Sequence, residues 1–150
     1  MDILLRGKDP TEHLLCSMYR SVKMGSENIV SLLPKVEDKF LKSEMTSGLN
    51  GYMDFSKSIE NMMHERGVEP SEPSALSKIG ARAGAFINTV MNSSTSRVAK
   101  VCALEMRSSA DRLESTCNEV SQSCDAHVVS ICRKIIEKER QNSEKMEAFL

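Results

Sequence analysis

Thiols are one group of side chains in this sequence that could do chemistry. Five cysteines occur among 150 residues, and none of them forms a C-x-x-C pair of the kind used for zinc binding or redox exchange. We expect reduced, mostly buried thiols at Cys16, Cys102, Cys117, Cys124 and Cys132. The alternative is that Cys117, Cys124 and Cys132 share one helix-facing stripe and respond to oxidants, which would require lowered thiol pKa values.

A carboxylate and an imidazole suggest a metal site. Glu60 and His64 are four residues apart, which places them on one side of a helix. Carboxylate-bridged di-iron bundles need a Glu-x-x-His motif on each of two helices, and the sequence contains no such motif. A solvated surface pair is therefore favoured, and we predict no bound metal and no cofactor. The metal alternative would recruit further side chains in the fold, namely Glu27, Glu44, Glu105 and His127.

Nucleophilic catalysis has no recognisable motif in the chain. The sequence contains neither a Gly-x-Ser-x-Gly elbow nor a glycine-rich phosphate loop. We therefore predict no catalytic residues, and an enzyme is the less favoured interpretation.

A polar stretch interrupts the apolar pattern in the third quarter of the chain. Residues 92–96 read Asn-Ser-Ser-Thr-Ser, and Arg97 follows them. Such side chains compete for backbone hydrogen bonds, and when buried they need polar partners. We expect a structural polar layer that fixes helix register. The alternative is a small anion pocket formed by Asn92, Ser94, Thr95 and Arg97, with Arg97 as the bidentate donor.

Composition and charge exclude several classes of protein. The chain is 40% hydrophobic and 27% charged, as in an ordinary globular domain. Twenty basic and 21 acidic residues give a net charge of −1, which disfavours nucleic-acid binding and attraction to anionic membranes. The longest apolar run is only a few residues, and the chain does not begin like a signal peptide. We expect a cytoplasmic protein without membrane insertion.

The elements that must position these side chains are all helical. Helix-start signals and prolines predict helices over about 10–33, 35–66, 74–120 and 122–149. Apolar residues three and four apart mark one face of the first helix: Leu15, Met18, Val22, Gly25, Ile29 and Leu32. The same spacing marks the second: Leu41, Met45, Gly48, Tyr52, Phe55, Ile59 and Met62.

The last two helices are less regular in sequence. We expect the third to be one long helix with a weak, bent middle, and a true break near 92–96, giving five helices, is the alternative. Residues 137–145 are almost wholly polar, so this part of the last helix either projects from the bundle or depends on local Glu/Lys pairs. The fold class is all-α, a single domain forming an antiparallel up-down-up-down four-helix bundle.

Three segments carry a family resemblance. They are 24–27 (MGSE), 32–38 (LLPKVED) and 88–99 (NTVMNSSTSRVA). They resemble a family of small, uncharacterised bacterial all-helical proteins with an MG, LLPKVED, MNT and STSHIAEM pattern, and the resemblance covers nearly the whole chain. It implies a bacterial cytoplasmic protein of ferritin-like shape, with no established activity. Here Arg97 stands at the family's His position and Lys100 at its Glu position, which puts a metal or proton role of those positions in doubt.

These observations favour a non-enzymatic helical-bundle protein that binds a partner or assembles with itself. We expect a homodimer formed through apolar surface that the bundle leaves exposed. One alternative is a ferritin-like protein that handles metal or oxidants. The other is a sensor of a small anion or ligand, built on the polar residues around Arg97.

Overall fold

The computed structural model describes residues 9–70 and 94–150. This part of the chain forms four α-helices: α2 (Pro10–Leu32), α3 (Lys39–Glu65), α5 (Thr95–Val120) and α6 (Ala126–Glu147). Two short 3-10 turns, Leu33–Lys35 and Ser121–Ser123, join α2 to α3 and α5 to α6. The described residues contain no strand, so the all-α prediction is confirmed for them.

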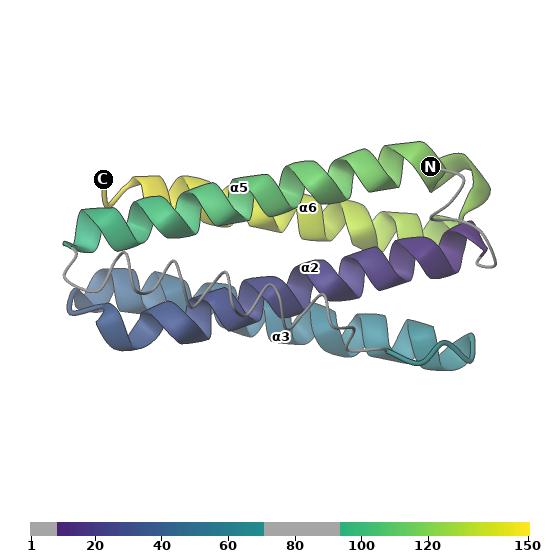
Figure 1. Ribbon diagram of the computed structural model, residues 1–150, viewed down its shortest axis with the longest axis horizontal. Helices are drawn as coiled ribbons and strands as arrows, with labels where there is room; N and C mark the ends of the chain where they lie inside the picture. The colour runs from purple at the N-terminus through teal and green to yellow at the C-terminus, as the bar shows by residue number, and fades with distance from the viewer. Residues whose placement is uncertain (1–8, 71–93) are drawn as a thin grey trace.

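The four helices lie side by side, each antiparallel to its neighbours in the bundle (Figure 1). Their order along the chain does not alternate, however, because α3 ends and α5 begins at opposite ends of the bundle. As a result α5 runs parallel to α3, and the predicted up-down-up-down order does not hold for this pair. None of the helices that the structure describes has the length and apolar content that a membrane span needs.

Aspartate side chains begin the first two helices. Asp9 Oδ1 accepts hydrogen bonds from the backbone N–H groups of Thr11 (2.7 Å) and Glu12 (3.2 Å). Asp38 caps α3 in the same way, so α3 begins at Lys39 and not near residue 35. The predicted start is too early because the residues just before the cap form a 3-10 turn followed by extended backbone.

A serine begins α5. Ser94 has an extended backbone, and its hydroxyl accepts a hydrogen bond from the backbone N–H of Arg97 (3.3 Å). A residue in this conformation cannot lie inside a helix, so a continuous helix over 74–120 is wrong at Ser94. The break lies within the predicted weak stretch at 92–96. The rest of the predicted helix before it, residues 74–93, lies outside the described residues.

The polar half of α6 packs into the bundle. Glu139, Asn142 and Ser143 are buried, and Met146 is 1% exposed. The expectation that residues 137–145 project, or are held only by local Glu/Lys pairs, is therefore wrong. These residues continue the three-four spacing of the apolar face, so the helix keeps turning polar side chains toward its neighbours.

The bundle interior is filled by Leu, Ile, Val, Ala, Met and Cys side chains from all four helices. The predicted faces of α2 and α3 point into it, with only Gly25 and Phe55 partly exposed. Gly25 leaves room for the ring of Tyr52, because a Cβ placed there would lie 2.4 Å from Tyr52 Cζ. A side-chain ring, rather than the backbone of a neighbouring helix, fills the space at this glycine.

We expect Gly25→Ala to lower the free energy of unfolding by about 1–3 kcal/mol, because the buried Tyr52 ring must shift to admit the methyl group. Gly51→Ala is the matched control, since a methyl group there would meet no described atom within 4 Å and alanine favours the helix by about 0.5–1 kcal/mol. Urea unfolding of both variants measures the difference. Equal effects of the two substitutions would contradict the close packing at Gly25.

Candidate functional site: a buried carboxyl in the bundle interior

Glu139 is the most deeply buried charged residue in the described structure, with 1% of its surface exposed. It lies on α6 and faces α3, where the hydroxyl of Tyr52 donates a hydrogen bond to Glu139 Oε2 at 2.9 Å. Tyr52 is itself buried, and its ring lies against Gly25 of α2. Helices α6 and α3 therefore meet at this carboxyl group, and α2 lies against the ring of the tyrosine that donates to it.

Glu139 is accompanied in the core by four other buried polar residues that the structure describes: Tyr52, Ser109, Asn142 and Ser143. The hydroxyl of Ser143 donates to the backbone oxygen of Ala103 on α5 at 2.8 Å. Two buried atoms, Ser109 Oγ and Glu139 Oε1, make no hydrogen bond of normal geometry with any described residue. Most buried polar groups in proteins are paired, so this centre is unusual.

Burial raises the pKa of Glu139 to about 7, from an ordinary value of 4.5. The nearby hydroxyls of Ser109 and Tyr52 lower the pKa of Glu139, as do the cations Arg112 and Arg140. Together these groups do not offset the loss of solvation. Burial also raises the pKa of Tyr52 well above its ordinary value, and the neighbouring Glu139 raises it further. The tyrosine therefore stays a hydroxyl donor, and the carboxyl is the member of the pair that titrates near neutrality.

A carboxyl with this pKa is chemically suited to exchange a proton near neutral pH. Its burial keeps a dissolved substrate away from it in this conformation, because only 1% of Glu139 is exposed. What the arrangement can do is join α6 to α3 through a hydrogen bond whose strength depends on protonation.

The predicted metal candidates are not brought together. Glu60 Oε1 lies 3.8 Å from Lys23 Nζ and accepts a hydrogen bond from Ser56 Oγ (3.4 Å), while His64 is exposed. Among residues 9–70 and 94–150, no three His, Cys, Asp or Glu side chains form a group that could hold a metal ion. Glu60 and His64 thus occupy the surface position that the sequence favoured. The other residues considered for this site, Glu27, Glu44, Glu105 and His127, add no such group.

The polar layer predicted around Arg97 is not found there. Ser94 and Arg97 are exposed at the start of α5, and Thr95 is only partly buried. Asn92 lies outside the described residues, and an anion pocket involving it stays a prediction. The expectation of burial fails for Ser94 and Arg97 because Ser94, whose own backbone is extended, is the N-cap of α5 and lies with Arg97 at the exposed start of this helix.

All five thiols are without disulfides, and Cys102, Cys117 and Cys132 are buried, as predicted. Burial raises the pKa of Cys102 to about 12. It also raises the pKa of Cys132, to which the adjacent Cys117 thiol contributes, and that of the partly exposed Cys124. An oxidant-responsive stripe would need shifts in the opposite direction.

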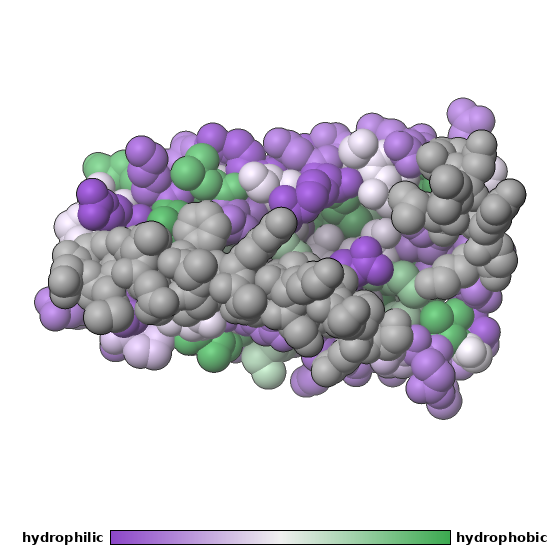
Figure 2. Space-filling model, viewed as in Figure 1, coloured by the Kyte–Doolittle hydropathy of each residue, from purple (hydrophilic) through white to green (hydrophobic). Residues whose placement is uncertain are grey.

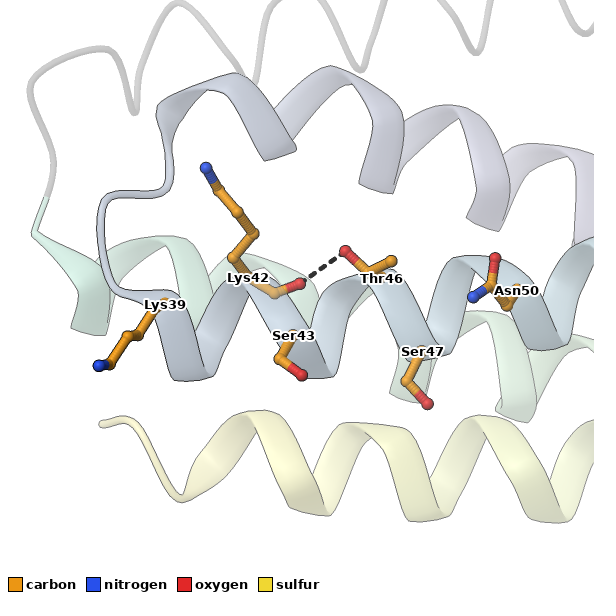
Figure 3. A pocket seen from close by; sticks show the side chains of 6 residues that line it. All are labelled: Lys39, Lys42, Ser43, Thr46, Ser47 and Asn50. Carbon is orange, nitrogen blue, oxygen red and sulfur yellow. Dashed lines mark hydrogen bonds between the residues drawn. The ribbon is translucent and has the colours of Figure 1, made fainter.

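An open hollow lies along the first half of α3 (Figure 3). Its volume is about 530 Å³, and the described residues that line it are Lys39, Lys42, Ser43, Thr46, Ser47 and Asn50. The Thr46 hydroxyl is used within the helix, donating to the backbone oxygen of Lys42 at 2.8 Å. Lysines, hydroxyls and an amide make this a polar, solvent-exposed face of α3, and no sequence pattern singles it out.

Comparisons of the chain with protein-family models, with curated proteins and with solved structures gave no match. The resemblance to bacterial helical proteins therefore stays a prediction. Any functional argument for this chain depends on its own residues.

The sequence does contain a signal for the buried carboxyl. Positions 132, 135, 139, 142 and 146 are spaced alternately by three and four residues, so Glu139 and Asn142 occupy core positions of α6. A polar residue at a core position weakens the prediction of a buried face, which is why the apolar pattern stops at Ile136. Tyr52, four residues after Gly48 on the apolar face of α3, provides the matching hydroxyl.

We expect Tyr52→Phe to lower the free energy of unfolding by about 1–3 kcal/mol, because Glu139 Oε2 loses the only donor it has among the described residues. A double-mutant cycle with Glu139→Gln tests whether the two side chains act together. A coupling energy within about 0.5 kcal/mol of zero would show that they are not in contact.

We also predict an order of thiol reactivity in the native protein. A thiol reagent should modify the partly exposed Cys16 and Cys124 first, and the buried Cys102, Cys117 and Cys132 only as fast as the bundle opens. Mass spectrometry of peptides after timed alkylation gives the order. Rapid labelling of Cys132 in folded protein would contradict the packing of α5 on α6.

Proposed function

We propose that this chain is a non-enzymatic helical-bundle protein that assembles as a homodimer. The observation that carries the proposal is Phe40, at the start of α3. It is 66% exposed, the highest fraction among the large apolar side chains that the structure describes. Aromatic side chains are enriched at protein interfaces, where they supply much of the binding energy.

The surroundings of Phe40 support a contact with a second copy. Val30, near the end of α2, is 55% exposed and lies at the same end of the bundle (Figure 1). Glu37 and Lys39, three and one residues before Phe40 in the sequence, are exposed, and Lys39 Nζ lies 5.5 Å from the centroid of the Phe40 ring. We call the four residues Val30, Glu37, Lys39 and Phe40 the α2–α3 corner.

A two-fold axis makes one patch meet its own copy, so the patch must be complementary to itself. The α2–α3 corner meets this requirement, because it has an apolar centre with a negative and a positive side chain beside it. Pairing Phe40 with its copy would place Glu37 of one protomer near Lys39 of the other. The face in Figure 2 is mostly hydrophilic among its described residues, with several separate apolar areas.

Phe40→Ser should weaken the dimer about tenfold or more without destabilising the fold, because the ring is mostly outside the core. Sedimentation velocity over a micromolar concentration series measures the association. Met53→Ser is the matched control, since Met53 is 49% exposed on the same helix but outside the α2–α3 corner. A wild-type protein that is monomeric throughout the series would overturn the proposal.

A charge exchange tests the geometry of the contact. Glu37→Lys and Lys39→Glu should each weaken association, because each places like charges across the axis. The double variant restores opposite charges and should recover most of the affinity. If the double variant is as weak as the singles, the two copies do not meet around Phe40 in this way.

A further inference from the structure

We propose that protonation of Glu139 controls the packing of α6: the neutral carboxyl stays buried between α6 and α3, and the ionised carboxyl loosens the second half of α6 because its charge is poorly solvated there. Such control would act on the bundle itself and does not depend on the proposed homodimer. A carboxylate has about four acceptor positions on its two oxygens, and Glu139 receives one described hydrogen bond, from Tyr52 at 2.9 Å. Most of its acceptor positions are therefore unused.

The second oxygen shows that the centre is built for the neutral acid. Oε1 of Glu139 is buried and makes no hydrogen bond of normal geometry with the described residues, and the nearby Ser109 hydroxyl lowers the pKa of Glu139 without offsetting the effect of burial. A buried anion with so few donors is destabilised, whereas a neutral carboxyl needs fewer donors and can itself donate. The geometry therefore favours a proton on Glu139 in the packed state.

The neighbouring cations do not supply a dedicated partner. Arg140, on the same helix, is held by Asp111 Oδ1 (2.9 Å) and Glu114 Oε2 (2.6 Å) of α5. Arg112 of α5 acts on Glu139 through space, and no hydrogen bond joins the two in the described structure. A carboxylate at this position would thus lack the paired, hydrogen-bonded cation that buried charges need.

The remaining groups around the pair come from the other helices. On α3 the neighbour is Tyr52, whose own surroundings include Cys102 and Glu105 of α5. On α2 the Tyr52 ring meets Gly25, which has no side chain to titrate. Glu105 is a second negative group near this centre, and it disfavours a second charge there.

Ionisation of Glu139 affects α6 in particular because most of the buried side chains in the second half of this helix are polar. After Glu139 the buried positions are Asn142, Ser143 and Met146, so only one of the three is apolar. Ser143 is held by Ala103 of α5, and Asn142 lies beside Gly48 of α3. If the ionised Glu139 moved toward water, this half of the helix would keep little apolar burial facing α3.

The direction of the pH effect follows from the raised pKa of Glu139. Between pH 4.5, the ordinary pKa of a glutamate, and about pH 7, the pKa of Glu139 in the folded protein, the folded protein binds more protons than the unfolded chain. The contribution of Glu139 to stability is therefore complete below 4.5 and is lost as the pH rises through 7. Across this window the unfolding equilibrium constant should rise by on the order of a hundredfold because of this residue.

The test measures urea unfolding at about pH 5 to 8.5 for the wild type, Glu139→Gln and Glu144→Gln. Glutamine keeps the acceptor for Tyr52 but cannot ionise, so Glu139→Gln should lose the decline toward alkaline pH and be more stable than wild type there. Glu144, exposed on the same helix, is the control and should leave the decline unchanged. A Glu139→Gln variant that keeps the full wild-type pH dependence would overturn the proposal.

A second measurement covers the case in which Glu139→Gln does not fold. Carbon-13 NMR of the glutamate carboxyls in the wild-type protein reports the titration of Glu139 directly. A midpoint between about 6 and 8, with chemical-shift changes in the amides of residues 139–146, supports the proposal. A midpoint at or below about 5 would overturn it, whatever the variants show.

Discussion

The hydrogen bond between Tyr52 and Glu139 is the contact on which the arrangement of this bundle depends. It joins α3 to α6 through two side chains that are both buried, at 2.9 Å. Apolar side chains can slide past one another with small losses, but a buried carboxyl that loses its donor is left unsatisfied. The pair therefore selects one register of α6 on α3, and Gly25 selects the position of α2 by leaving space for the tyrosine ring.

The rest of the polar chemistry divides between the core and the surface around this contact. The thiols fill the core, where burial raises the pKa of Cys102 and Cys132 and keeps them in the unreactive thiol form. The exposed ion pairs, such as Arg66 with Asp125 at 3.3 Å, lie at the surface and contribute little to stability. The three buried thiols therefore act as packing side chains, and these ion pairs remain solvated.

Much of the fold could be predicted because local signals and apolar spacing agree. Asp9 with Pro10 marks the start of α2, and the faces of α2 and α3 follow a regular three-four pattern. The start of α5 could not be placed, because serine is both a poor helix former and a good cap, and the sequence does not say which role applies. The burial of the polar half of α6 could not be predicted either, because its core positions hold Glu139, Asn142 and Ser143, whose burial depends on partners on other helices.

If the Tyr52–Glu139 contact organises the bundle, the polar half of α6 must be packed as firmly as the apolar half. Native-state hydrogen exchange followed residue by residue at about pH 5, where Glu139 is neutral, is the most direct test, because amide protection reports how often each turn opens. We predict that the amides of Glu139, Asn142 and Ser143 are protected nearly as well as those of Cys132 and Ile135 in the first half of the helix. Protection that falls off sharply after Ile136 would refute this arrangement, since it would mean that the last turns of α6 are not held against α3 and α5.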